Sequence, residues 1–324
     1  MLKSLDVGFN FAAVKPESGP RRRWCIFTSA GDHNAIRLWL KGNTQPQWDL
    51  VIAYYGDDSE EFSELAKVSS YAFRTKGGKF QILKKLVTEK PEFFDQYSHV
   101  WVCDDDIKMS AAQIDEAFAI AEFYEFWVAQ PAFSPRSKIS HLINEYAGSH
   151  CDYRLVNFVE ENTPIFLREK LIPFLNVYNG SLTGHGNDWW YLNFFKANEL
   201  GHLRNFRKTN ELGRFAIIDR IQVINPHDVE KGQREIDRLQ PLAERYARWV
   251  EVMIINGLVV FPQMIFASCK ISSHRIPGVP VTRFDVARRI ASSPIRKLVR
   301  KYKKLSADWR KKRKATAVAG RIAQ

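Results

Sequence analysis

Cysteine is scarce in this chain, and no two cysteines have the spacing of a metal site. The 324 residues contain four, with no CxxC or CxxH motif, at Cys25, Cys103, Cys151 and Cys269. A disulfide framework or a structural zinc site is therefore not expected. We interpret the four as buried free thiols of a protein in a reducing compartment.

Long apolar runs are also missing. The most apolar region, residues 249–269, is interrupted by Glu251, Asn256, Pro262 and Gln263, whereas a membrane-spanning helix needs about 20 apolar residues in succession. We expect a helix that runs into a buried strand, with a membrane-dipping hairpin as the alternative. At the N-terminal end no apolar core follows the basic residues 21–23, so no signal peptide is predicted.

The body of the chain lacks an excess of positive charge, although the whole chain has a formal net charge of +12. Residues 281–324 contain 15 Lys and Arg and 2 Asp and Glu, which leaves 33 of the 48 basic and 34 of the 36 acidic residues for the rest. A nearly neutral body argues against a surface built to grip nucleic acid. The basic tail predicts contact with an anionic partner.

What the chain does have is an alternation of strand and helix patterns. Strand-like runs at 23–32, 48–58, 99–103 and 127–133 alternate with helical patterns at 34–42, 77–90 and 110–126, where Ser110 is a plausible N-cap. We expect the fourth strand to stop at Pro131, a late strand within 215–228 and helix within 229–256. This order predicts an α/β fold with a mostly parallel sheet and helices on both faces.

Polar turns follow three of the predicted strands. They are Gly31-Asp32, Gly56-Asp57-Asp58 and Asp104-Asp105-Asp106. In open α/β sheets ligands bind beyond the carboxyl ends of the strands, so these turns predict one cleft lined by acids and glycines. Carboxylates there suit Mg²⁺ or Mn²⁺, which neutralise a diphosphate leaving group. The alternative is solvated turn acids, or acids that favour a helix N-terminus.

Other candidates lie further from these turns. The stretch "GHGNDWWY" places Asp188 at a predicted helix start, as a general base for an acceptor hydroxyl or, alternatively, an N-cap. One of its aromatic residues, 189–191, could stack on a sugar, although most aromatic runs are core. Lys76 and Lys79, among glycines, could bind phosphate or form a solvated basic face; a P-loop motif is missing. His227 is a weak candidate metal ligand.

The ordered motifs resemble a family of glycosyltransferases of the GT-A class that was first catalogued only as a domain of unknown function. The resemblance covers Arg23 to Asp228 and rests on "TSAGDHNAIRLWL", "WDLVIAYYGD", "KGGKFQILKKL", "WVCDDDI" with "VAQPAF", "NFVEENTPIF", "GHGNDWW" and "AIIDRIQVI". It implies a GT-A-like, Rossmann-like domain, a nucleotide-diphospho-sugar donor, and Mn²⁺ or Mg²⁺.

Site residues follow from the same resemblance. It implies that Asp104 and Asp106, with Asp105 between them, bind the metal, the ribose and the diphosphate. Ala30, Gly31 and Asp32 would lie near the nucleotide base. Asp188 would be the base of an inverting reaction, and Asp219 matches an acid in the last core strand. The family's histidine, about six residues after that acid, is replaced here by Asn225; His227 lies two residues further on.

The C-terminal tail has an amphipathic pattern. Helical spacing places Ile295, Leu298, Val299, Tyr302, Leu305 and Trp309 on one face, with Lys and Arg on the other. This pattern is typical of a helix on an anionic membrane surface; a solubilising tail or a nucleic-acid contact is the alternative. We predict a flexible lead-in at 1–20, a glycosyltransferase domain at 21–270 and a helical basic extension at 271–324.

Together these predictions describe a metal-dependent glycosyltransferase on the inner face of the cytoplasmic membrane, where the acceptor is a carbohydrate or a glycolipid. Two other classes remain open. One is a catalytically inactive, membrane-bound protein with the same fold. The other is a metal-dependent phosphotransferase or hydrolase, although the haloacid-dehalogenase pattern requires Thr or Val where Ile107 stands. A nucleic-acid binder driven by the tail is the least favoured; its affinity would fall steeply with salt.

Overall fold

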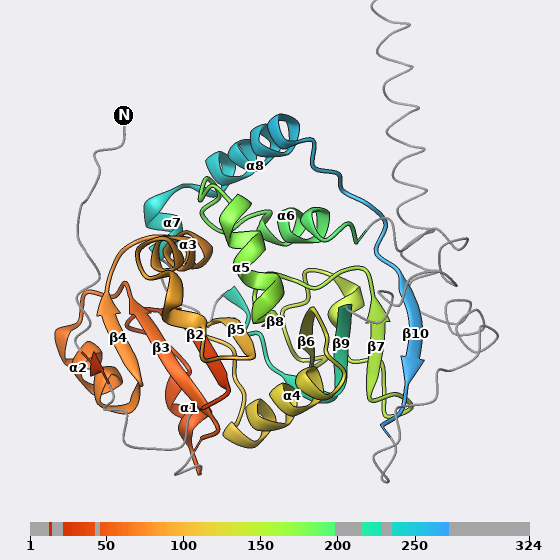
Figure 1. Ribbon diagram of the computed structural model, residues 1–324, viewed down its shortest axis with the longest axis horizontal. Helices are drawn as coiled ribbons and strands as arrows, with labels where there is room; N and C mark the ends of the chain where they lie inside the picture. Colours follow the sequence, from red (N-terminus) through yellow and green to blue (C-terminus); the bar gives the residue numbers. More distant parts are fainter. Residues whose placement is uncertain (1–12, 15–21, 43–45, 198–214, 229–234, 272–324) are drawn as a thin grey trace, which may run out of the picture. The chain divides into compact units, whose positions relative to one another are not determined.

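The computed structural model describes residues 13–14, 22–42, 46–197, 215–228 and 235–271. A ten-stranded sheet crosses this part of the chain in the order β1-β4-β3-β2-β5-β8-β6-β9-β7-β10 (Figure 1). The strands are β1 (Ala13–Val14), β2 (Trp24–Ala30), β3 (Trp48–Tyr54), β4 (Tyr71–Arg74), β5 (His99–Asp104), β6 (Val128–Phe133), β7 (Tyr153–Val156), β8 (Ile165–Leu167), β9 (Phe215–Val223) and β10 (Ile265–Cys269). Seven of these ten described strands run in one direction, and only β1, β7 and β8 oppose them. The predicted mostly parallel sheet is confirmed.

Helices cover both faces of this sheet. They are α1 (Ile36–Leu40), α2 (Ser59–Val68), α3 (Lys79–Glu89), α4 (Ala111–Phe123), α5 (Arg168–Val177), α6 (Asn187–Phe194), α7 (Glu235–Leu239) and α8 (Leu242–Asn256), with short 3₁₀ turns at Pro91–Phe94 and Leu142–Asn144. Buried side chains form two clusters. One takes residues from α3, α5 and α6, and the other from α1, α2 and α4. The α/β fold class is therefore confirmed.

The central strands β2, β3, β5 and β6 are buried on both faces, which explains their continuous apolar sequence. In β2, Cys25 and Phe27 belong to one cluster, while Ile26 and Ala30 belong to the other. Successive side chains of a strand point to opposite faces, so each strand contributes to both cores. Full burial of an apolar side chain stabilises the fold by roughly 1.5–3 kcal/mol.

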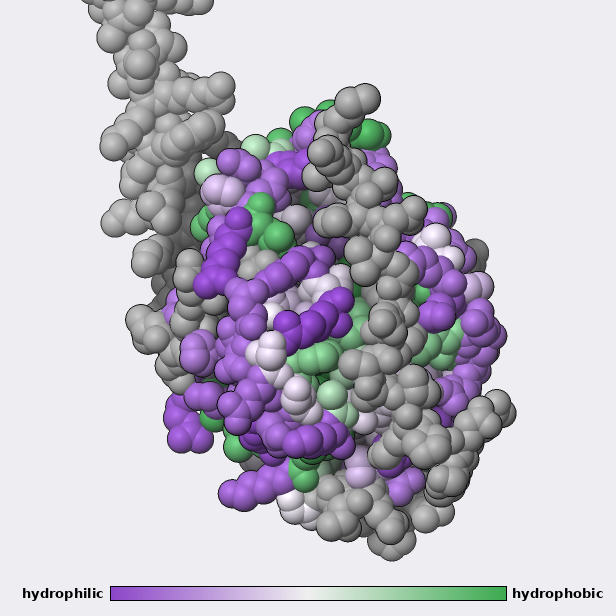
Figure 2. Space-filling model, turned by 90° about the vertical axis from the view of Figure 1, so that its left-hand side faces the viewer, coloured by the Kyte–Doolittle hydropathy of each residue, from purple (hydrophilic) through white to green (hydrophobic). Residues whose placement is uncertain are grey.

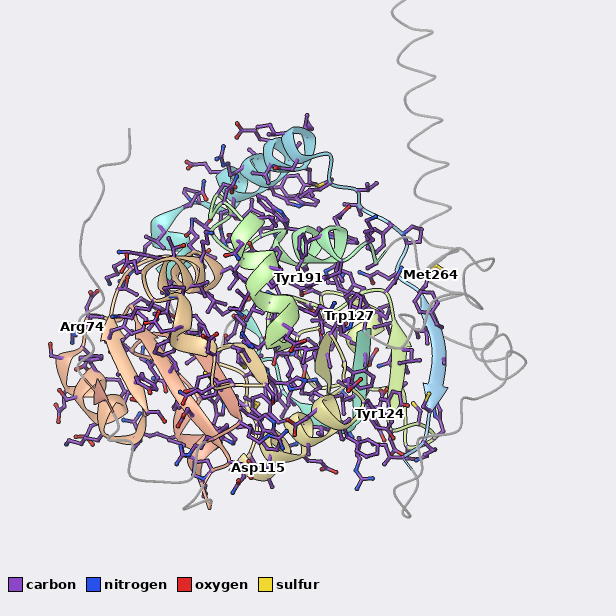
Figure 3. All side chains as sticks on the ribbon, viewed as in Figure 1. Arg74, Asp115, Tyr124, Trp127, Tyr191 and Met264 are labelled. Atoms are coloured by element: carbon purple, nitrogen blue, oxygen red, sulfur yellow. The ribbon has the colours of Figure 1, made fainter. Side chains whose placement is uncertain are left out.

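Tyr191 shows how the aromatic run after the Gly-rich loop is used. Its side chain lies between α5 and the sheet (Figure 3), where its ring is 5.8 Å from that of Phe174 on α5 and 5.2 Å from that of Phe166 on β8. Its hydroxyl donates to the Val159 carbonyl oxygen at 2.6 Å. Tyr191 is therefore a core residue, which agrees with the reading of this run as mostly core.

Among the local predictions, one helix cap is confirmed, two elements were not predicted and one strand end is wrong. Ser110 caps α4 as predicted, since its hydroxyl accepts the Gln113 N–H at 3.3 Å. β4 and α2 had not been predicted. β6 passes through Pro131 to Phe133, so the expectation that it stops there is wrong. Its pairing with β9 shifts register between Pro131 and Ala132, because proline has no N–H for the ladder.

The C-terminal part of the described chain follows the preferred interpretation of residues 249–269. α8 leads through residues 257–264 into β10, which pairs with β7. Within the described ranges, no helix has the length and apolarity needed to cross a bilayer. The four cysteines are buried free thiols, as predicted.

The chain divides into two compact units, Met1–Gly278 and Val279–Gln324. The second unit, and with it the predicted amphipathic tail, lies outside the described residues. Most of the predicted lead-in does too, but Ala13–Val14 within it pairs with β4. The predicted boundaries at 20–21 and 270–271 stay predictions.

Candidate functional site

A cleft of about 780 Å³ lies at the carboxyl ends of β2, β3 and β5, where the polar turns were expected to meet. Five segments form most of its lining. They are Gly31 and Asp32 after β2, Gly77 to Phe80 at the start of α3, Asp104 to Asp106 after β5, Glu160 to Asn162, and Thr183 to Trp189. Parallel strands bring their carboxyl ends to one edge of the sheet, so turns far apart in sequence share one site.

The three consecutive aspartates have three different surroundings. Asp104 lies at the end of β5, and its Oδ1 accepts a hydrogen bond from Lys79 Nζ at 2.6 Å. Asp105 is buried and its Oδ2 accepts the Gly31 N–H at 2.8 Å. Burial, and then the charge of neighbouring Asp106, raises the pKa of Asp105 well above its ordinary value. Asp105 therefore ties the end of β5 to the turn after β2, while Asp104 and Asp106 line the cleft.

Lys79 is the cation of this cleft wall. It is the first residue of α3, and its ammonium group also donates to the carbonyl oxygens of Glu161 at 2.8 Å and of Val102 and Asn162 at 3.3 Å. Only 11% of its side chain is exposed. Lys79 thus fastens α3 to the end of β5 and to the 160–162 loop, and it places a positive charge at the predicted diphosphate position.

Lys76 and Ala30 lie outside the cleft lining, unlike the other predicted nucleotide-binding residues. The ammonium group of Lys76 binds the Tyr55 carbonyl oxygen and, at 2.9 Å, Asp57 Oδ1. Ala30 is fully buried at the end of β2. Asp32 does line the cleft. Its Oδ1 accepts the Tyr54 hydroxyl at 2.6 Å, and this hydrogen bond lowers the pKa of Asp32.

Two glycines of the wall are required by packing between segments of the protein. A Cβ on Gly78 would lie 2.4 Å from the Thr183 carbonyl oxygen. Gly186 has φ +93°, and its Cβ would lie 1.9 Å from Trp249 Cδ1 on α8. The "GHG" stretch was expected to let backbone approach a ligand. At Gly186 the close approach is instead to α8.

Asp188 lies in the first turn of α6. It is 6% exposed, it lines the cleft, and its Oδ1 accepts the Trp189 N–H at 2.8 Å. Burial raises the pKa of Asp188 to about 7. A carboxylate with such a pKa is suited to accept a proton near neutral pH.

Glu160 and Glu161 were missed by the sequence reasoning, although "VEEN" places two acids in an otherwise apolar stretch. Burial, followed by the charge of Asp188, raises the pKa of Glu160 to about 7 and that of Glu161 well above its ordinary value. Glu160 accepts hydrogen bonds from the side-chain amides of Asn144 and Asn162, both at 2.7 Å. Glu161 accepts the Asn187 N–H at 3.2 Å, at the start of α6. These acids position the wall on which Asp188 lies.

The remaining predicted acid, Asp219, and the predicted metal ligand His227 lie outside the cleft lining. Asp219 is buried in β9 and forms a two-point ion pair with Arg154, with Nε–Oδ2 at 2.7 Å and Nη2–Oδ1 at 2.9 Å. It does not line the cleft, and neither does His227, which is exposed. The Asp219 match therefore corresponds to an internal ion pair, and His227 is not brought to Asp104 and Asp106.

A cation held by Asp104 and Asp106 would have a simple donor set. Within the described residues, no group of three or more His, Cys, Asp or Glu side chains is placed to hold a metal ion. Asp104 and Asp106 nevertheless line the same cleft with hard carboxylate oxygens. Mg²⁺ is often bound by one or two carboxylates and completes its shell with water and substrate phosphates. The two aspartates fit such a cation, and a third protein ligand is not required.

An aromatic wall closes the cleft on the side of α8. Trp189 lines the cleft, as do His185, Tyr246 and Trp249. The ring centroids of these last three lie between 5.2 and 5.7 Å apart. Aromatic rings with exposed faces suit the apolar faces of sugars. Sequence reasoning had named Trp189 in this context and had missed Tyr246 and Trp249, whose i, i+3 spacing on a helix was the available signal.

Comparison with known proteins adds likeness of fold. No family model matches the chain, and no curated protein matches it. Among solved structures it is similar to S. aureus TarS 1–349, with 12% identity over 72% of this chain and 74% of that chain and a TM-score of 0.44. The UDP complex of that fragment has the same identity and coverage and a TM-score of 0.41. A further structure of S. aureus TarS is 13% identical over 72% of this chain and 45% of that one, with a TM-score of 0.42. Likeness at this level assigns no activity to the chain.

Proposed function

We propose that this protein is a glycosyltransferase that moves a sugar from a nucleotide-diphospho-sugar to an acceptor hydroxyl. The observation that carries the proposal is one cleft that holds two unlike groups of acids. Asp104 and Asp106 stand at the end of β5, where Lys79 donates to Asp104, and Asp188, in the first turn of α6, lines the same cleft with a pKa raised to about 7. The first group suits a diphosphate with its cation, and Asp188 suits proton removal.

The donor side of the cleft is formed by β2, α3 and β5. Gly31 and Asp32 follow β2 and suit a nucleoside, because the glycine lets the backbone approach the base and the aspartate offers oxygens to hydroxyl groups. The start of α3 presents backbone N–H groups together with Lys79, and both favour phosphate oxygens. The diphosphate is therefore expected between α3 and the end of β5.

Asp104 and Asp106 would hold a divalent cation, Mn²⁺ or Mg²⁺, which would supply Lewis-acid stabilisation of the departing diphosphate. Lys79 adds a positive charge on the same side from the protein itself. Asp105, held by the Gly31 N–H, keeps the turn after β2 at a fixed distance from the two ligand acids. Preorganised charges of this kind are worth more in a partly dry cleft than in water.

Asp188 is the proposed general base if the reaction inverts the anomeric carbon. The acceptor hydroxyl gives its proton to the Asp188 carboxylate while its oxygen bonds to that carbon. The bond from this carbon to the diphosphate oxygen breaks, and its electron pair leaves with the diphosphate. In a retaining reaction Asp188 instead positions the acceptor. Trp189, Tyr246 and Trp249 suit the acceptor side.

The proposed acceptor is a carbohydrate or a glycolipid at the inner face of the cytoplasmic membrane. This part of the proposal is supported by the sequence of residues 281–324, whose 15 basic residues outnumber 2 acidic ones. Basic amphipathic segments bind anionic lipid. Nucleic acid is not proposed as a partner, because the remainder of the chain carries no basic excess.

The pH dependence of transfer is the first expected result. The base acts in its ionised form, and burial raises the pKa of Asp188 to about 7. Below pH 7 the carboxyl is increasingly protonated, so kcat/KM should fall up to tenfold per pH unit. The measurement is kcat/KM from pH 5 to 9, with donor affinity measured over the same range. A profile flat down to pH 5 with constant donor affinity contradicts this assignment.

The test of the proposed function is nucleotide binding. Thermal unfolding is followed with UDP, GDP, CDP and ADP, each with and without Mn²⁺, for the wild type and Asp104→Asn/Asp106→Asn. A ligand at 100 times its dissociation constant adds about 2.7 kcal/mol to the free energy of unfolding. We expect one nucleotide to raise Tm with Mn²⁺ in the wild type and not in the variant.

The matched control for this experiment is Glu92→Gln/Asp95→Asn, which removes two exposed acids outside the cleft. It should respond to the nucleotide as the wild type does. If no nucleotide raises Tm in any of the three proteins, the transferase proposal fails. If binding occurs and donor is never turned over with any acceptor extract, the chain is a binding protein of the same fold.

A further inference from the structure

Large apolar side chains are exposed along α8, next to the exposed acids Glu244 and Glu251. Leu242, Tyr246, Val250 and Ile254 follow one another at intervals of four residues, and 62%, 53%, 39% and 76% of each is exposed. We name these four residues, together with Ile255, Val259 and Val260, the α8 stripe; the last three are 70%, 51% and 49% exposed. Met264, labelled in Figure 3, lies further along the same connection to β10 and is 37% exposed.

This exposure is built into the helix, because the other face of α8 is fastened to the protein. Val252 is buried in the core. Arg245 is buried and paired with Asp237, and Trp249 packs against Gly186. An ordinary surface helix turns its apolar face inward. Here the inward face holds an arginine, and the outward face holds the aliphatic side chains.

The position of α8 supports a surface role. α8 stands at the upper edge of the described structure in Figure 1, and Figure 2 shows some hydrophobic residues at the top of the molecule among hydrophilic ones. Leu242 and Tyr246 also line the cleft. The apolar surface is therefore continuous from the mouth of the cleft to the outward face of α8. Large exposed apolar patches mark interaction sites.

We propose that the α8 stripe rests on an anionic phospholipid bilayer. A bilayer is inferred from exposed apolar side chains followed by a basic segment. The stripe is apolar, with Glu244 and Glu251 exposed on the same helix, and twelve residues after the end of β10 the chain enters residues 281–324, with 15 basic and 2 acidic residues. Stable attachment to a membrane surface usually takes two signals, such as an apolar insertion and a polybasic segment. Both are present in this chain.

This proposal deepens the proposed function, on which its consequence for the acceptor rests. A stripe in contact with lipid places the mouth of the cleft, at Leu242 and Tyr246, at the membrane surface. An acceptor held by a lipid then reaches Asp188 without leaving the bilayer interface. Membrane attachment is measured without donor, and the nucleotide thermal shift is measured without lipid, so failure of one is distinguishable from failure of the other.

The experiment is vesicle flotation of the full chain, using phosphatidylcholine vesicles with and without 30% phosphatidylserine. The test variant is Ile254→Glu/Ile255→Glu, whose positions are exposed and do not line the cleft. The matched control is Val68→Glu/Val177→Glu, which adds the same charges at positions 47% and 54% exposed on α2 and α5. Thermal unfolding checks that all variants fold.

We expect the wild type and the control variant to float with anionic vesicles, and the test variant to bind at least tenfold less at equal Tm. Raising salt to 0.5 M should weaken the wild type without abolishing binding, because apolar insertion is not screened. Equal flotation of the test variant and the wild type overturns the role of the stripe. A wild type that never floats overturns it too, and so does a stripe variant that turns a dimer into a monomer without altering flotation.

Discussion

Asp188→Asn is expected to lower kcat/KM for sugar transfer by about 100- to 10,000-fold, the range that a positioned general base contributes. The substitution is nearly isosteric. An asparagine oxygen can still accept the Trp189 N–H, as Oδ1 of Asp188 does at 2.8 Å. What is lost is the ability to take a proton from the acceptor.

The unfolding temperature of Asp188→Asn distinguishes a loss of catalysis from misfolding. The folded-state pKa of Asp188, about 7, is above the ordinary value of an aspartate, 3.8. Ionisation of this buried carboxyl therefore destabilises the fold, and the protein loses stability as pH rises from the ordinary pKa to the raised one. Asp188→Asn should unfold at the same temperature as the wild type or a higher one at pH 8, and it should keep the nucleotide-dependent shift.

The measurement pairs steady-state transfer with the nucleotide thermal shift, using Asp95→Asn as an exposed control. Transfer within threefold of the wild type would remove Asp188 from the base role and favour the positioning role of a retaining reaction. Loss of transfer together with loss of the nucleotide shift would place Asp188 in donor binding instead. In both measurements Asp95→Asn should give the wild-type result.

Asp219→Asn is expected to lower the free energy of unfolding by about 3–5 kcal/mol, the cost of leaving a buried charge without its partner. Arg154 and Asp219 have side-chain exposures of 4% and 0%. Asp219 also accepts the Ala147 N–H at 2.9 Å. The neutral amide leaves the Arg154 guanidinium uncompensated in the protein interior.

Urea unfolding measures this effect, and a double-mutant cycle tests its cause. Arg154→Met/Asp219→Leu should be less destabilised than the sum of the two single variants, because it leaves no unpaired charge. The folded fraction of Asp219→Asn should still bind the nucleotide with wild-type affinity, since Asp219 does not line the cleft. An unchanged unfolding free energy with abolished transfer would return Asp219 to the active site.

These two aspartates show what resemblance of sequence can and cannot assign. Both were matched to acids of the family motifs; Asp188 follows a Gly-rich segment and Asp219 lies within an apolar one. Only Asp188 lines the cleft, because the turn before α6 is itself part of the cleft lining. Asp219 points into the interior, toward an arginine 65 residues earlier in the chain.

Local patterns were enough to predict the class of the fold, the order of the main strands and helices, and the edge of the sheet where the turns meet. Periodicity and capping are local, so the β2, β3, β5 and α4 patterns needed no knowledge of the rest of the chain. The same reasoning predicted one cleft from the turns at 31–32, 56–58 and 104–106; all of these residues except Asp57 and Asp58 line it. The carboxyl ends of parallel strands lie at one edge of the sheet, so the turns that follow them meet at that edge.

The contacts that each of these residues makes in the cleft could be known only from the folded structure. Asp105 turns to the Gly31 N–H and Asp104 to Lys79, across 74 and 25 positions of sequence. Glu161 became part of the wall through Lys79 and α6, and α8 turned its apolar side chains outward because Arg245 and Trp249 occupy its inner face. Such pairings depend on which segments lie side by side after folding, and local sequence patterns carry no information about that distance.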